Sequence, residues 1–179
     1  MTKVVEVYAD GGVIGASRSL IGGTWAFCLV DEDSVRVVER MGVIRPGSHG
    51  FPDVTNNQAE LFALLRGLET VVEQEGAGWS GKILTDSLVT IRRVRGFWTN
   101  GMPMTVPKEW VIRLGTVLER LGPLEYMNLK GHPNKEQLKA GVTAKGKPVS
   151  VHNKWCDEAC TRAGALFVAS GQAKSQAPA

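Results

Sequence analysis

The first apolar stretch of the chain limits its fold more than any other. Residues 4–9 read Val-Val-Glu-Val-Tyr-Ala, an apolar and β-branched run that predicts a buried strand. The run leads into Asp10, which is followed by Gly11 and Gly12. We expect the two glycines to open a turn whose bare backbone lets a ligand approach closely. The stretch therefore predicts a core strand that ends on a carboxylate.

Two more strands follow at short intervals. Residues 23–30 alternate large apolar side chains (Trp25, Phe27, Leu29) with smaller ones, and residues 35–44 form a further strand-like run. The turn between them, residues 31–34, is acidic and short. The first three strands are therefore expected to form an antiparallel meander, with loops at residues 11–22 and 45–54.

A helix and a short strand come next. Thr55 or Asn56 is a suitable N-cap, and the apolar residues that follow recur at helical spacing up to the break at residues 76–81. Residues 82–87 then form a short apolar strand that again ends on a carboxylate, Asp86. Its two-sided apolar character predicts a central parallel strand beside the first one.

The second half of the chain alternates helices with one strand. We expect a basic helix at 87–95, an aromatic and polar turn at 97–101, an amphipathic helix at 107–121 and a strand at 124–129. A long basic loop, 131–151, precedes a last helix at 152–168. The order predicts an α/β fold, a mixed sheet covered by helices in one domain, residues 1–168. Residues 169–179 are small and polar and are expected to be a disordered tail.

Composition excludes some classes of protein. No apolar run approaches the roughly 20 residues that a membrane helix needs, so no membrane partner is expected. The first strand begins at once, which predicts neither a signal peptide nor a preceding domain. Three cysteines in apolar contexts predict a reducing, cytoplasmic location without disulfides. A net charge of +3 permits a nucleic-acid partner without arguing for one.

Four acids occupy comparable places in these elements. Asp10 and Asp86 stand at the ends of two strands that are expected to be parallel neighbours. They therefore project from the same edge of the sheet, where ligand sites of α/β proteins lie. Glu60 lies early in the first long helix, and Asp157 lies in the last one. Converging carboxylates repel each other, and all-oxygen ligation suits Mg²⁺ or Mn²⁺. Two such ions about 4 Å apart can clamp the attacking and leaving oxygens of a phosphodiester.

Five short segments, in order along nearly the whole chain, resemble type 1 ribonuclease H. The segments are Tyr8-Ala9-Asp10-Gly11-Gly12, Thr55-Asn56-Asn57-Gln58-Ala59-Glu60-Leu61, Thr85-Asp86-Ser87, Lys130-Gly131-His132 and Asn153-Lys154-Trp155-Cys156-Asp157-Glu158-Ala159. The resemblance implies the ribonuclease H-like fold, a five-stranded mixed sheet with helices on both faces. It also implies a monomeric endonuclease that uses two Mg²⁺ ions, or Mn²⁺, to hydrolyse the RNA strand of RNA–DNA hybrids. The products would carry 5′-phosphate and 3′-hydroxyl ends.

The same resemblance assigns roles to individual residues. Asp10, Glu60, Asp86 and Asp157 correspond to the catalytic metal-binding carboxylates, and His132 to a catalytic histidine of a flexible loop. A further set corresponds to substrate-binding positions along the RNA or DNA strand: Gly11, Gly12, Thr55, Asn56, Asn57, Gln58, Ser87, Phe97, Trp98, Asn100 and Asn153. Among these, the residues 56–58 are expected to read the minor groove, where the RNA 2′-hydroxyl lies.

The chain also departs from the family pattern. The turn after Asp10 lacks the usual Asn-Pro, and the basic region around residues 92–95 is reduced. The segment from His132 to His152 is longer than in compact members and adds Lys135, Lys139, Lys145 and Lys147. We hypothesise that this loop supplies phosphate contacts in place of the reduced basic region. Neutralising its lysines should then flatten the salt dependence of binding.

Other interpretations of the same residues stay open. Each acid alone is consistent with a turn residue, a helix-dipole partner or a solvated helix face. His152, Cys156 and Cys160 share one helix stripe, which suggests zinc, but one stripe cannot complete a tetrahedral site and buried packing is favoured. Two alternatives concern the whole chain: a catalytically silent nucleic-acid-binding module on this fold, and a related nuclease acting on another substrate such as branched DNA.

Overall fold

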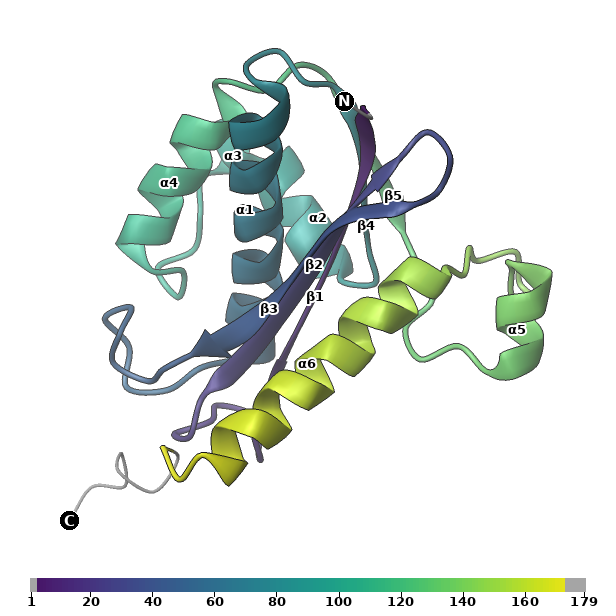
Figure 1. The fold of residues 1–179 in the computed structure, drawn as a ribbon. Coiled ribbons are helices and arrows are strands. Elements are labelled where there is room, and N and C mark those ends of the chain that lie inside the picture. Colours follow the sequence, from purple (N-terminus) through teal and green to yellow (C-terminus); the bar gives the residue numbers. More distant parts are fainter. Residues whose placement is uncertain (1–2, 173–179) are drawn as a thin grey trace.

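A central five-stranded sheet organises the computed structural model, which describes residues 3–172 (Figure 1). The strands are β1 (Val4–Val13), β2 (Gly23–Asp31), β3 (Arg36–Ile44), β4 (Gly81–Thr85) and β5 (Leu124–Asn128). Their order across the sheet is β3-β2-β1-β4-β5. The first three strands pair antiparallel, whereas β4 pairs parallel to both β1 and β5. The predicted meander and the predicted parallel neighbour of the first strand are both confirmed.

Helices cover both faces of this sheet. They are α1 (Asn56–Glu75), α2 (Leu88–Arg95), α3 (Phe97–Asn100), α4 (Lys108–Leu118), α5 (Lys135–Ala140) and α6 (Val151–Ala169). Figure 1 shows α1 and α4 on one face and α6 crossing the other. The predicted fold class, a five-stranded mixed sheet with helices on both faces, is therefore confirmed.

Two apolar cores lie on the two sides of the sheet. On one side, the buried face of α1 packs on β1 and β2, with Leu64, Leu68 and Phe27 fully buried. On the other side, Cys156 and Ala159 of α6 pack against Tyr8 and its neighbours. Because β1 lies between the two cores, its backbone is held from both faces.

The glycines after Asp10 do not open a turn, contrary to the prediction. β1 continues through Val13, and Gly11 and Gly12 pair with Trp25 and Thr24 of β2. A Cβ at Gly11 would lie 2.3 Å from the backbone carbonyl carbon of Ala59, so only glycine lets α1 approach β1 this closely. Glycine favours a turn in isolation, but pairing with β2 and packing of α1 keep this segment extended.

The remaining differences are local. The predicted aromatic turn at 97–101 contains the short helix α3, and the loop at 131–151 contains α5. The helix predicted at 107–121 is shorter, ending at Leu118. Of the predicted tail, Ala169 ends α6 and residues 170–172 form a turn, while residues 173–179 lie outside the described residues. Within residues 3–172, no helix has the length and apolarity needed to cross a membrane.

Candidate active site

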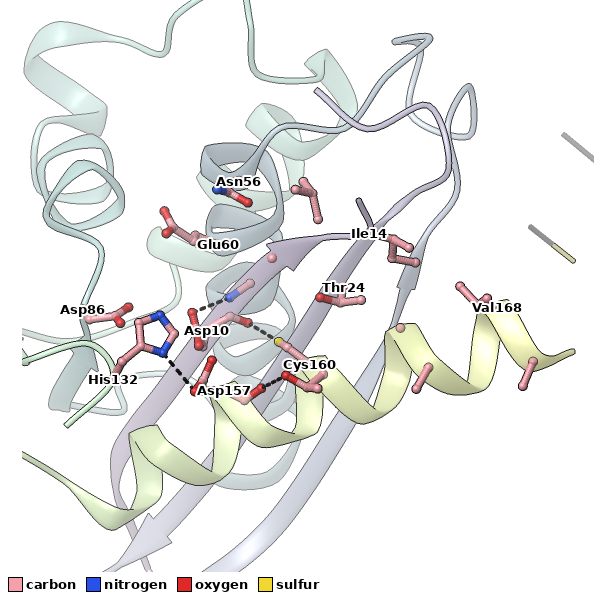
Figure 2. A pocket seen from close by; sticks show the side chains of 17 residues that line it. Asp10, Ile14, Thr24, Asn56, Glu60, Asp86, His132, Asp157, Cys160 and Val168 are labelled. Atoms are coloured by element: carbon pink, nitrogen blue, oxygen red, sulfur yellow. Dashed lines mark hydrogen bonds and ion pairs between the residues drawn. The ribbon is translucent and has the colours of Figure 1, made fainter. Parts of the chain in front are cut away.

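Three of the four predicted acids meet at one edge of the sheet. One carboxylate oxygen from each of Asp10, Glu60 and Asp86 lies within 4.8 Å of the other two. Asp10 comes from β1, Glu60 from the second turn of α1, and Asp86 directly follows β4 (Figure 2). Three elements far apart in sequence thus place their carboxylates together. We call Asp10, Glu60 and Asp86 the acid cluster.

Two glycines make this convergence possible. Gly11 lets the N-terminal part of α1, and with it Glu60, lie against β1. At Gly131, a Cβ would stand 2.4 Å from Oδ2 of Asp86, so the missing side chain leaves room for that carboxylate. The sequence motif Lys-Gly-His therefore contains a glycine with a packing role at the site.

Burial, and after it mutual repulsion, raises the pKa values of the acid cluster. Asp10 is 8% exposed, and burial, followed by the nearby Asp86 carboxylate, raises its pKa well above the ordinary value. The backbone N–H of Gly11 donates to Oδ1 of Asp10 (2.8 Å) and opposes this rise in pKa. Burial likewise raises the pKa of Glu60 and of Asp86. A positive charge placed near the acid cluster would lower the free-energy cost of ionising its carboxylates.

Asp157 and His132 form a pair at the side of the cluster. Asp157 lines the same cleft from α6, but its contact is with the histidine: Nδ1 of His132 lies 3.2 Å from Oδ2 of Asp157. The histidine side chain is 81% exposed, and its backbone φ is +47°. The nearby His132 also lowers the pKa of Asp86, against the larger effect of burial. The fourth acid thus contacts an exposed histidine at the side of the cluster.

Ser87, a predicted substrate contact, lies beside Glu60. It caps α2 by accepting a hydrogen bond from the backbone N–H of Thr90, and its hydroxyl donates to Oε2 of Glu60. The side chain is buried. Because this hydroxyl donates to a carboxylate of the acid cluster, it orients Glu60; its contact with the RNA strand stays a prediction.

The acid cluster opens into a cleft of about 970 Å³. Figure 2 shows the acids and His132 at one end and Ile14, Thr24 and Val168 at the other. Sequence reasoning missed this second, less polar end. It is lined by the residues of α6 that follow Asp157 at helical spacing: Cys160, Thr161, Gly164, Ala165, Val168 and Ala169. That spacing was the available signal.

The predicted minor-groove residues at the start of α1 separate into two groups. Asn56 and Asn57 are exposed, and Asn56 lines the cleft. Gln58 is 3% exposed, and both ends of its amide are engaged. Its Oε1 accepts from the backbone N–H of Thr55 (2.8 Å), and its Nε2 donates to the carbonyl oxygen of Thr105 (2.9 Å). The structure therefore gives Gln58 a capping role, which it shares with Thr55.

The other predicted contacts lie further from the acids. Trp98 is 64% exposed and stands edge-on to the half-buried Phe97, with ring centroids 4.7 Å apart. Asn100 is exposed at the end of α3. Asn153 is 1% exposed, so this side chain is buried within α6 packing instead of facing the cleft.

The histidine and cysteines that suggested zinc have separate partners. Sγ of Cys156 lies 4.0 Å from Sγ of Cys28, Cys160 donates to the carbonyl oxygen of Asp10, and the ring of His152 packs on Tyr8 at 5.0 Å. All three cysteines are free and buried. These surroundings agree with the interpretation favoured from the sequence, in which these side chains are buried packing residues.

Comparison with known proteins places these features in a family context. No protein-family model matches the chain. A curated ribonuclease H from Rhodopirellula baltica is 39% identical over 71 residues, 40% of this chain. The chain spans about two fifths of that relative's length, since the match covers 39% of it.

Solved structures match over most of the chain. The N-terminal RNase H domain of Rv2228c from Mycobacterium tuberculosis, solved as a fusion with maltose-binding protein, is 19% identical with a TM-score of 0.60, covering 93% of this chain and 99% of that one. RNase H1 from the archaeon Halobacterium salinarum is 20% identical with a TM-score of 0.58, covering 89% and 96%. LC11-RNase H1, from a compost metagenome and solved with an RNA/DNA hybrid, is 21% identical with a TM-score of 0.55, covering 88% and 97%.

At these identities the structural matches establish the fold, and the sequence match names the same family. The resemblance found in the sequence is thereby confirmed as a similarity to ribonuclease H proteins, and the chain has the ribonuclease H-like fold.

Proposed function

We propose that this chain is a metal-dependent endoribonuclease that cleaves the RNA strand of RNA–DNA hybrids. The observation that supports it most is the acid cluster, three carboxylates within 4.8 Å of one another at the end of an open cleft. The fold is shared with an RNase H1 that has been solved with an RNA/DNA hybrid. The proposed catalytic domain is residues 1–168.

The acid cluster fits divalent cations. Carboxylate oxygens are the ligands that Mg²⁺ and Mn²⁺ prefer. The raised pKa values of Asp10, Glu60 and Asp86 reflect burial first and repulsion between neighbouring carboxylates second. These three residues would hold the ions, with Asp157 completing the set; we propose two Mg²⁺ ions. When bound, such ions stabilise the charge that develops on a phosphodiester and lower the pKa of water.

The residues around the cluster have distinct tasks in this proposal. The N–H of Gly11 fixes the orientation of Asp10, and the hydroxyl of Ser87 fixes Glu60. Asp157 holds Nδ1 of His132, which leaves Nε2 of this exposed ring to exchange a proton at the cleft. Hydrolysis in this arrangement breaks the bond to the 3′-oxygen and leaves 5′-phosphate and 3′-hydroxyl ends.

Substrate recognition is proposed at both sides of the acids. Asn56 and Asn57 lie exposed at the start of α1, where their amides can meet base edges and 2′-hydroxyls in the minor groove. Trp98 offers an exposed ring against a sugar of the DNA strand. Thr55 and Asn100 would hold a DNA-strand phosphate. We further propose a monomer in a reducing, cytoplasmic compartment, which the three free cysteines support.

The test is cleavage of a hybrid labelled on both strands, in Mg²⁺, beside duplex DNA, duplex RNA and branched DNA. We expect cutting of the RNA strand of the hybrid alone, and its loss in Asp86→Asn. Asp33→Asn, which removes an exposed turn carboxylate, is the matched control and should cleave like the wild type. Binding without cleavage would establish the silent module instead, and preferred cleavage of branched DNA would establish the other nuclease.

A further inference from the structure

The positive charge of the chain is concentrated in one segment next to the acid cluster. We call residues 131–150, between β5 and α6, the basic lobe. It contains four lysines and one glutamate, a net charge of +3 that equals the net charge of the entire chain. The remaining residues are therefore balanced in formal charge. None of the ion pairs within residues 3–172 involves a lobe lysine.

The basic lobe is a folded element. α5 begins with a capping box in which Asn134 and Gln137 satisfy each other's backbone N–H groups. Val142 forms a β-bridge with Pro148, and the backbone N–H of Lys147 donates to Oγ1 of Thr143 (3.0 Å). These bonds give the lysine backbone a defined position, which a freely moving loop would not provide.

A backbone hydrogen bond joins the lobe to the segment beside the acid cluster, next to one of the lobe lysines. The N–H of Lys130 donates to the carbonyl oxygen of Pro148 (2.9 Å), and the next residue, Gly131, lies directly against Asp86. Lys147 immediately precedes Pro148, so it stands close to this junction. It is half-buried, whereas Lys145, two residues earlier, is exposed. The positive charge of Lys147 also lowers the pKa of Asp86, against the larger effect of burial.

We propose that Lys147 binds a phosphate of the RNA strand next to the bond that is cleaved, an inference that rests on the proposed function. Its ammonium has no carboxylate partner within salt-bridge distance among the described residues, so it is available to a ligand. A lysine presents a point charge that suits phosphate. The three other lobe lysines, which are exposed, add attraction for the hybrid backbone at longer range.

The experiment measures hybrid binding at several salt concentrations in an Asp10→Asn background, which removes cleavage. Each phosphate contact contributes about 0.7–0.9 to the slope of log affinity against log salt. Lys147→Met should flatten the slope by about that amount, and Lys147→Arg should restore it. Lys145→Met changes formal charge equally and should leave the slope closer to that of the parent protein.

Equal slopes for Lys147→Met and Lys145→Met would overturn the proposal. So would tighter Mg²⁺ binding by Lys147→Met with an unchanged slope, because the lysine would then act only on Asp86. An uncharged methylphosphonate beside the cleaved bond in the RNA strand should abolish the effect of Lys147→Met. If only DNA-strand substitutions did so, the assignment to the RNA strand would fail.

The role of Lys147 can be tested separately from the proposed function. Cleavage of the hybrid by the wild-type protein tests the function by itself. If the wild type cleaves while Lys147→Met binds with the parental slope, only the role of Lys147 is refuted.

Discussion

Replacing Asp10 with asparagine should stabilise the metal-free protein while it abolishes cleavage. Asp10 is buried, and carboxylate oxygens of Glu60 and Asp86 lie within 4.8 Å of one of its own. Asparagine keeps the shape and the oxygen that accepts from Gly11 N–H, but it removes the charge. A residue selected for folding alone would not be an aspartate here, so the stability gain is a direct sign of a functional site.

The size of the effect follows from the spacing of the charges. Two unit charges separated by the 4.8 Å upper limit repel each other by about 3.5 kcal/mol at an effective dielectric constant of about 20. Because the acids can take up protons instead of bearing this repulsion in full, we expect a net gain of about 1–3 kcal/mol at neutral pH. In a domain of this size each kcal/mol raises Tm by about 2–4 °C.

The pH dependence has a defined sign. The pKa of Asp10 in the folded protein is raised above its ordinary value, so folding favours the protonated form. This contribution to stability is complete below the unfolded-state pKa and is lost as pH rises through the higher folded-state pKa. Asp10→Asn should therefore gain little over the wild type in acid and most at neutral pH.

The assay is thermal unfolding in EDTA across the pH range and again in Mg²⁺. Asp33→Asn is the control, because Asp33 lies exposed in the turn after β2. In Mg²⁺ the wild type should recover much of the difference, since cations relieve the same repulsion. An Asp10→Asn protein that is less stable than the wild type in EDTA at neutral pH would refute the electrostatic reasoning.

Two further predictions concern residues that support the acid cluster. Gly11→Ala should lower the free energy of unfolding by about 3 kcal/mol, the upper range for overpacking, because the new Cβ meets backbone atoms that cannot move aside. Gly164→Ala, at a position where a Cβ has room, is the control, and both variants are measured by urea unfolding. Equal stabilities of the two variants would contradict the packing argument. Ser87→Ala should weaken Mg²⁺ binding by about 10–100-fold, because Glu60 loses the hydroxyl that orients it. Calorimetry measures this affinity, Ser87→Thr should retain it, and an unchanged affinity in Ser87→Ala would remove Ser87 from the site.

Local sequence patterns were sufficient to predict the order of the helices and strands and the positions of the clustered acids. Strands that alternate, a helix with a clear N-cap and carboxylates at strand ends are local signals, and they led to the correct sheet and to Asp10, Glu60 and Asp86. The same pattern singled out Asp157, and the family resemblance added His132; the contact between these two residues is a fact of tertiary structure. A pairing of residues 25 positions apart has no local signal.

The errors came where long-range contacts override local preference. Gly11 reads as a turn residue, but its partners on β2 and α1 keep it in a strand. The family resemblance assigned Gln58 to the minor groove, although the spacing Thr-x-x-Gln is also that of a capping box. The same kind of box, from Asn134 to Gln137, begins α5, which was missed because glycine and lysine dominate the surrounding loop.

In the proposed function, the acid cluster acts with divalent cations to hydrolyse the RNA strand. The most direct measurement identifies the ends of the RNA products made in Mg²⁺ by the wild type and by Asp10→Asn. We expect 3′-hydroxyl and 5′-phosphate ends, no products in EDTA and none from Asp10→Asn. Products with 2′,3′-cyclic phosphate ends, or undiminished cleavage by Asp10→Asn, would contradict it, because the RNA would then be cut without these carboxylates.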